Sequence, residues 1–175
     1  VSWSRDGKYL VYAAADKGKN GQIYRVNVQT KKVQKLSKST KNVDEDPDLS
    51  PDGKKVAFVS DRKLPTGPVG HQIWVAKADG SGAKALIPDR QENNGWFALT
   101  PAWSPDGKQI AFVWLPPIDL HAGSSMQLSR LDADAGGLWV MDADGGQPKL
   151  LTACGTPPTE APIWSPDGKH IAYAC

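Results

Sequence analysis

The sequence lacks most of the features that point to a particular ligand. Its net charge is only +2 over 175 residues, and lysine and arginine are scattered along it, so nothing favours a surface for nucleic acid or for a membrane. The longest apolar run, Ile110 to Leu115, is far too short to cross a bilayer. We therefore expect no nucleic-acid partner and no membrane insertion.

Residues with catalytic or metal-binding chemistry are also scarce. The three histidines, His71, His121 and His170, are too few and too dispersed to form a converging metal site. The sequence contains no Gly-x-Ser-x-Gly motif, which forms the nucleophile elbow of α/β-hydrolases. We expect this chain to have no catalytic residues, no metal and no other cofactor.

Cysteine is limited to Cys154 and Cys175. Both should lie at strand ends on the same face, so a disulfide is conceivable, but they fall in neighbouring repeat units. A disulfide requires its two Cα atoms to lie within about 7 Å of each other. Two free thiols are therefore the favoured interpretation.

Internal repetition, in contrast, is abundant. The phrase Trp-Ser-Pro-Asp-Gly-Lys, or a close variant, occurs four times, beginning at Trp3, Leu49, Trp103 and Trp164. An aromatic residue follows each glycine by five positions: Tyr12, Phe58, Phe112 and Tyr173. A second aromatic, in another strand-like run, precedes a leucine by 12 positions in three copies: Tyr24, Trp74 and Trp139. Such self-similarity indicates stacked units that supply one another's core.

Each repeat predicts four antiparallel strands in a meander. Ser-Pro-Asp-Gly fits a tight turn with glycine at positive φ. A second turn is expected at Ala78-Asp79-Gly80 and at Ala143-Asp144-Gly145, with Gln29-Thr30-Lys31 as the counterpart in the first copy. The runs between turns are short and rich in Val, Ile and aromatic residues, which is typical of strands. The predicted fold class is all-β, a β-propeller of four-stranded blades.

The predicted blades are three complete ones, at residues 1–46, 47–100 and 101–161, and the first two strands of a fourth at 162–175. Closed propellers have about four to eight blades. We therefore interpret the chain as a piece of a longer protein whose remaining blades cover the open faces, or alternatively as a chain whose open faces a partner covers. No signal sequence is visible, but the chain begins inside an expected strand, so its natural start is expected upstream.

The repeat resembles the TolB-type, WD-like propeller blade, over nearly the whole chain from Trp3 to Cys175. The resemblance lies in Pro-x-Trp-Ser-Pro-Asp-Gly-Lys-x-Ile-Ala-Phe and in the segment from Leu138 to Gly146. It implies a non-catalytic module for protein or peptide binding in the bacterial cell envelope, periplasmic or secreted. The alternative it implies is the propeller domain of a prolyl-oligopeptidase-type serine peptidase, whose α/β-hydrolase domain lies outside this chain.

The candidate binding residues lie in the connections of variable length, between the second and third strands and between blades. A meander places these connections on one rim of the disc, and rigidly held loops that tolerate insertion commonly carry function. Trp96 and Phe97 stand out because exposed aromatics are enriched in binding hot spots, although burial in a local core is an equal alternative. The candidates are Arg62, His71, Arg90, Trp96, Phe97, His121 and Arg130.

A second group of candidates should lie at the mouth of the central channel, where the chain enters an innermost strand. These residues are Asp44, Glu45, Asp46 and Glu160. A ring of carboxylates could hold a cation or a basic peptide group, but solvated loop charges are the commoner arrangement. The repeated Trp3, Trp103 and Trp164 are expected in the core between blades, because Leu49 occupies the same position of the repeat.

Overall fold

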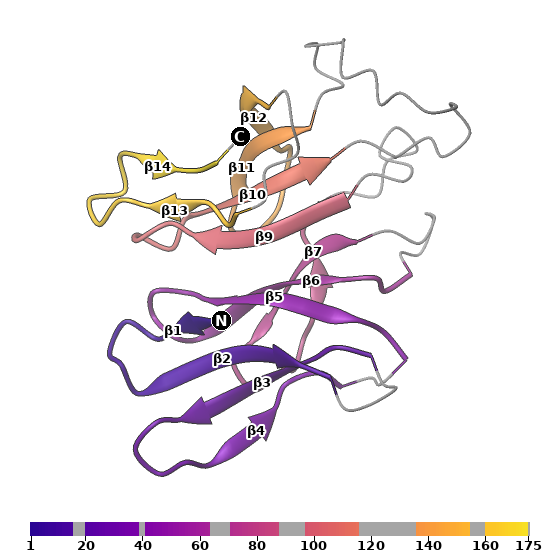
Figure 1. Ribbon diagram of the computed structural model, residues 1–175, viewed down its shortest axis with the longest axis vertical. Coiled ribbons are helices and arrows are strands. Elements are labelled where there is room, and N and C mark those ends of the chain that lie inside the picture. Colours follow the sequence, from indigo (N-terminus) through magenta and orange to yellow (C-terminus); the bar gives the residue numbers. More distant parts are fainter. Residues whose placement is uncertain are drawn as a thin grey trace.

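The computed structural model describes residues 1–15, 20–38, 41–63, 71–87, 97–115, 136–154 and 160–174. Within these ranges the regular structure consists of strands alone, arranged in four antiparallel sheets (Figure 1). No described segment forms a helix with the length and apolarity to span a membrane. The predicted all-β fold class is confirmed.

Three of the sheets are complete four-stranded meanders, which we call blades 1, 2 and 3. Blade 1 comprises β1 (Ser2–Trp3), β2 (Tyr9–Ala14), β3 (Gln22–Asn27) and β4 (Val33–Lys35). Blade 2 comprises β5 (Asp44–Leu49), β6 (Lys55–Ser60), β7 (Gln72–Lys77) and β8 (Lys84–Ala85). Blade 3 comprises β9 (Phe97–Trp103), β10 (Gln109–Leu115), β11 (Gly137–Asp142) and β12 (Lys149–Ala153).

In the described residues, the fourth sheet, which we call the half-blade, consists of β13 (Ile163–Trp164) and β14 (Ile171–Ala172). The four described sheets do not close into a ring, as expected for an incomplete propeller. The innermost strands β5 and β9 begin at Asp44 and Phe97. A few residues that the sequence pattern assigned to the end of one blade thus pair within the next sheet.

The repeated phrase forms the same turn in all four copies. Gly7, Gly53, Gly107 and Gly168 have φ between 67° and 71°, a region that favours glycine. In the second copy, the Ser50 hydroxyl donates to Asp52 at 2.7 Å, and the same carboxylate oxygen accepts the Lys54 amide at 3.0 Å. The other three copies repeat both bonds. Both hydrogen bonds lower the pKa of the turn aspartate, and the bond from the serine hydroxyl has the larger effect. The aspartates are Asp6, Asp52, Asp106 and Asp167.

The core lies between the blades, because an internal blade is buried on both faces. Along β6, Val56 and Phe58 face blade 1, whereas Ala57 and Val59 face blade 3. All four side chains are at most 4% exposed. The apolar residues between blades 1 and 2 are Val11, Ile23, Leu36, Leu49, Val56, Phe58 and Ala76. Stacked sheets thus supply one another's core, as the repeat predicts.

The phrase tryptophans behave differently along the stack. Trp103 is 7% exposed, and its indole N–H donates to the carbonyl of Asp48 in the preceding blade at 3.2 Å. Trp164 makes the same bond to Ala102 at 3.0 Å. Trp3 is 58% exposed, so its predicted core position is wrong. The reason is that no sheet in the described part of the chain packs against that side of blade 1.

Cys154 is buried and disulfide-bonded. The favoured prediction of a free thiol is therefore wrong for this residue. Cys175 lies outside the described residues. Because disulfides persist mainly in oxidising compartments, the bond bears on where the protein works.

Candidate binding surface

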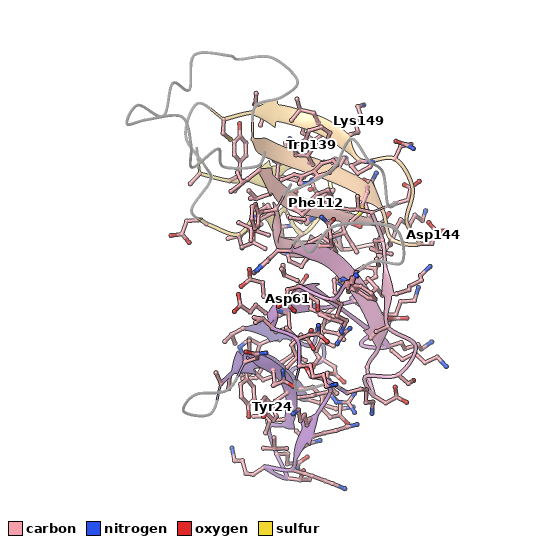
Figure 2. All side chains as sticks on the ribbon, turned by 90° about the vertical axis from the view of Figure 1, so that its right-hand side faces the viewer. Tyr24, Asp61, Phe112, Trp139, Asp144 and Lys149 are labelled. Carbon is pink, nitrogen blue, oxygen red and sulfur yellow. The ribbon has the colours of Figure 1, made fainter. Side chains whose placement is uncertain are left out.

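The tight turns and the variable connections lie at opposite ends of the strands, as the meander predicts. In Figure 1 the turns β1–β2, β9–β10 and β13–β14 lie on one side of the molecule, and the chain leaves β2, β6 and β10 on the other. Figure 2 views this second side and shows Asp61 near the middle of the stack of sheets. We call the second side the loop rim; its described candidates are Asp44, Glu45, Asp46, Arg62, His71 and Phe97.

Asp44 begins β5 and is fully buried. Its carboxylate accepts the Ser60 hydroxyl at 2.7 Å and pairs with the guanidinium of Arg62 at 2.7 Å. Its amide donates to the Gly21 carbonyl at 3.0 Å, which links blade 2 to blade 1. A buried carboxylate with these partners cannot line an open channel mouth, so that prediction is wrong for Asp44.

Arg62 is held by packing as well as by charge. Its side chain is 16% exposed, and its guanidinium lies 5.0 Å from the ring centre of Phe58 and 5.2 Å from that of Trp74. Cation–π contacts and a buried carboxylate together satisfy the charge. Arg62 therefore joins strands within blade 2 and is poorly placed to bind a partner, contrary to the sequence-based expectation.

His71 and Phe97 come together from neighbouring blades. Their rings lie 5.7 Å apart at an angle of 54°. The Ala98 amide donates to the His71 carbonyl at 2.8 Å, which fixes the start of β9 against the start of β7. Both side chains are half-buried. Phe97 thus combines the two alternatives from the sequence: it packs locally and still presents part of its ring to solvent.

Asp46 and Thr100 occupy equivalent positions of β5 and β9 and share an unusual backbone. Their φ values are 47° and 48°, although neither is glycine and each directly precedes a proline. The pairing of both strands with their neighbours shifts register at this point. The Thr100 amide donates to the Asp46 carboxylate at 3.3 Å. Left-handed backbone at non-glycine residues is strained and concentrates at functional sites.

The remaining acidic candidates are exposed. Glu45, Asp46 and Glu160 all present carboxylates to solvent. Among the residues that the structure describes, no group of three or more His, Cys, Asp and Glu side chains is arranged to hold a metal ion.

Asp48 is an acidic residue that is not among the candidate site residues predicted from the sequence. It lies inside β5, partly buried, and its carboxylate accepts the Trp103 amide of β9 at 2.7 Å. Burial raises its pKa, against hydrogen bonds from the Ser2 hydroxyl and the Trp103 amide, which lower it. Asp48 therefore links the innermost strands β1, β5 and β9. The only signal in the sequence is that Asp48 directly precedes Leu49, the residue of the second repeat that is equivalent to Trp103.

The other loop candidates lie outside the described residues. They are Arg90, Trp96, His121 and Arg130. Their places on the loop rim stay predictions.

The arrangement of stacked, radially placed four-stranded meanders defines a β-propeller. A profile of the TolB beta propeller domain matches residues 1–117, more than half of the chain. The chain therefore belongs to the TolB-type β-propeller family, as its repeat phrase indicates.

Individual relatives come from more than one kind of protein. An uncharacterized protein of Agrobacterium fabrum is 31% identical over 174 residues, which cover 98% of this chain and 52% of that protein. An uncharacterized peptidase, YuxL of Bacillus subtilis, is 27% identical over 127 residues, covering 72% of this chain and 16% of the peptidase. The chain thus spans about half the length of the first relative.

Solved structures show the same architecture. The structure of a putative TolB from Agrobacterium tumefaciens superposes with a TM-score of 0.70 at 26% identity, over 99% of this chain and 57% of that one. TolB from Acinetobacter baumannii gives a TM-score of 0.67 at 26% identity, over 97% and 35%. A prolyl endopeptidase, at 21% identity and a TM-score of 0.58 over 94% and 24%, shares the fold.

Proposed function

We propose that this chain is a non-catalytic TolB-like propeller module that binds a protein or peptide partner on its loop rim. The observation that supports this proposal is the junction of blades 2 and 3. There the half-exposed rings of His71 and Phe97 contact each other, and the amide of Thr100 donates a hydrogen bond to the carboxylate of Asp46, both residues having left-handed backbone. A rigid patch with aromatic and acidic groups suits a peptide with an apolar residue beside a basic one.

The proposed location is the bacterial periplasm or the extracellular space. The disulfide at Cys154 supports an oxidising compartment. Relatives named Tol-Pal system protein TolB, from Francisella tularensis, match 57 residues of this chain at up to 40% identity, and we extend the cell-envelope setting to this chain on that likeness.

A photo-crosslinking experiment tests the proposed surface. The cross-linking residue is placed at His71 on the loop rim or, as the matched control, at Lys54 in a turn on the opposite side, and each protein is exposed to periplasmic extract. We expect a discrete adduct from the His71 position and none from Lys54. Equal labelling from both positions would remove the loop rim as the binding surface.

The likeness to the Bacillus subtilis peptidase supports a second candidate: the propeller of a serine peptidase, whose disc screens a hydrolase domain. Two measurements separate the candidates. A Gly-x-Ser-x-Gly elbow followed by Asp and His in the same reading frame would support the peptidase. In either case we expect the purified 175 residues to leave chromogenic Pro- and Ala-containing peptides uncleaved, and cleavage by this chain would contradict both proposals.

A further inference from the structure

The outer part of blade 1 concentrates lysine in a way that the other blades do not. The segment that follows its third strand, residues 28–43, contains five lysines and no aspartate or glutamate. The corresponding segment of blade 2, residues 78–96, contains one lysine and one arginine against three acidic residues. That of blade 3, residues 143–162, contains one lysine against two acidic residues. Because the three blades share one fold, the fold does not require these five lysines.

The five lysines are exposed and lie along the outermost strand of blade 1. Four of them are on β4 or within three residues of its ends. In the described part of the chain, Lys31, Lys32 and Lys35 form no ion pair, whereas the phrase lysines of blades 1 and 2 lie within 4.0 Å of an aspartate of their own turn. We call β4 with these residues the lysine edge; its lysines are Lys31, Lys32, Lys35, Lys38 and Lys41.

The backbone of β4 is available on its outer side. Among the described strands β4 pairs with β3 alone, and it lies at the circumference of the stack (Figure 1). The Asn27 amide donates to the Lys32 carbonyl, and the Leu36 amide donates to the Ile23 carbonyl. Alternate residues of an antiparallel strand bond to the same neighbour. The residues between, at 33 and 35, therefore direct their N–H and C=O groups outward, where a further strand could pair.

Protection against aggregation does not account for the lysine edge. Lysine on an edge strand does discourage unwanted strand pairing. The outermost strands of blades 2 and 3, however, carry only Lys84 and Lys149 for this purpose. Lysines crowded along one strand also repel each other, and an anionic partner would relieve that repulsion.

We infer that the lysine edge binds an acidic, extended segment of a partner protein, which adds to β4 as a fifth strand of blade 1. The backbone of this segment pairs with the outward groups of Val33 and Lys35, and its aspartate or glutamate side chains meet the lysines. The free strand edge favours a polypeptide over a lipid surface or a nucleic acid, because only a polypeptide can use it. The lysine edge is separate from the loop rim, so its test does not depend on the proposed function.

A synthetic acidic strand serves as the probe. A fluorescently labelled peptide in which Glu alternates with Thr is added to the whole chain, and binding is followed by anisotropy. We expect saturable binding that weakens as salt is added, because exposed charges are screened. The matching peptide with Gln in place of Glu should not bind. A Glu-Thr peptide whose pairing amides are N-methylated keeps its charge but cannot extend the sheet, and should bind at least about tenfold more weakly.

Variants of the protein locate the site. Lys32→Gln/Lys35→Gln/Lys38→Gln removes three charges from the lysine edge, and we expect the affinity for the Glu-Thr peptide to fall about tenfold. A control variant removes the same charge from exposed lysines elsewhere and should keep most of the affinity. Circular dichroism should show both variants folded, because every substituted side chain is exposed. The control variant is Lys55→Gln/Lys108→Gln/Lys149→Gln.

Hydrogen exchange on the unchanged chain gives an independent measurement. The amides of Val33 and Lys35 should exchange more slowly when the Glu-Thr peptide is added. Equal losses in the two triple variants, equal binding of the N-methylated peptide, or slowed exchange only at the loop rim would overturn the inference. So would binding of phosphatidylglycerol vesicles or duplex DNA, abolished by the lysine-edge variant, without binding of the acidic peptide. That last result would assign the lysine edge to a phosphate-rich partner.

Discussion

Blades 2 and 3 fill one position of the repeat with opposite chemistry. In blade 2, the first pair between the innermost strand and the second strand is Asp44 with Ser60, and Arg62 completes a buried polar group. In blade 3 the equivalent pair of the repeat is Ala98 with Trp114, which follows a first pair of Phe97 with Leu115. The Trp114 ring lies 4.9 Å from the ring of Trp139 at 75°, an edge-to-face arrangement.

The difference shows that the blade fold fixes the strand register at this position but accepts either a buried polar group or a buried aromatic ring there. Desolvation of two charges is costly, and a buried ion pair repays it only when all its groups are hydrogen-bonded. Asp44 meets that condition through Ser60 and Arg62. The tryptophan solution needs no charge, because its stabilisation comes from buried area and from ring packing. The predictions below test this comparison from the largest expected effect to the smallest.

Trp114→Ser places the serine of blade 2 into blade 3 without its aspartate and arginine. Trp114 is 6% exposed, so the variant loses buried area and leaves a cavity. We expect the free energy of unfolding to fall by about 4 kcal/mol, measured by urea denaturation. Trp114→Phe is the control and should lose much less, because it keeps an aromatic ring. Equal losses in the two variants would show that the ring does not fill this position.

Asp44→Ala removes the partner of Arg62 and leaves its charge in a largely buried place. We expect a loss of about 3 kcal/mol, at the lower end for a broken buried pair because Arg62 retains some contact with water and two aromatic faces. The double variant Asp44→Ala/Arg62→Met should be more stable than Asp44→Ala alone. If the double variant is the less stable one, an unpaired charge does not explain the single loss.

Gly80→Ala and Gly145→Ala compare the interface between blades 1 and 2 with the interface between blades 2 and 3, at the glycine of the second turn of each repeat. Both substitutions put a side chain at positive φ, but only the Cβ at Gly80 would overlap a backbone carbonyl. We expect losses of about 2 kcal/mol for Gly80→Ala and about 1 kcal/mol for Gly145→Ala, by thermal or urea unfolding. The reverse order would contradict the closer approach of blades 1 and 2.

Asp48→Asn tests the pH dependence of the innermost strands. Burial raises the pKa of Asp48 above its ordinary value of 3.8. In the pH window between 3.8 and the higher pKa of the folded state, the folded state therefore binds more protons than the unfolded state. Its contribution to stability is therefore lost as pH rises through the window, and the variant should avoid that loss. The turn aspartates have lowered pKa values and act in the opposite sense, losing their contribution as pH falls below 3.8.

The measurement is the difference in free energy of unfolding between Asp48→Asn and the unchanged chain, from about pH 3 to pH 7. The turn aspartates are common to both proteins and cancel. We expect the difference to grow in favour of the variant as pH rises. Parallel profiles would mean that Asp48 ionises as easily in the folded chain as in the unfolded one.

Local patterns predicted the elements well. The four Ser-x-Asp-Gly turns form with their glycines at positive φ, as the repeat predicts. The candidate site was predicted less well. The sequence predicted Asp44 at the channel mouth and Arg62 in a loop, whereas the two side chains form a buried ion pair. The reason is that the innermost strand begins at Asp44, earlier than the turn signals indicate.

The sequence by itself determined the blade, because each turn is closed by hydrogen bonds and backbone angles within a few residues, and the short apolar runs between the turns favour strands. Tertiary structure alone decided which charges are buried, that Asp48 joins three strands, and that Cys154 is disulfide-bonded. These properties depend on groups distant in the chain, whose desolvation and pairing exist only once one sheet lies on the next.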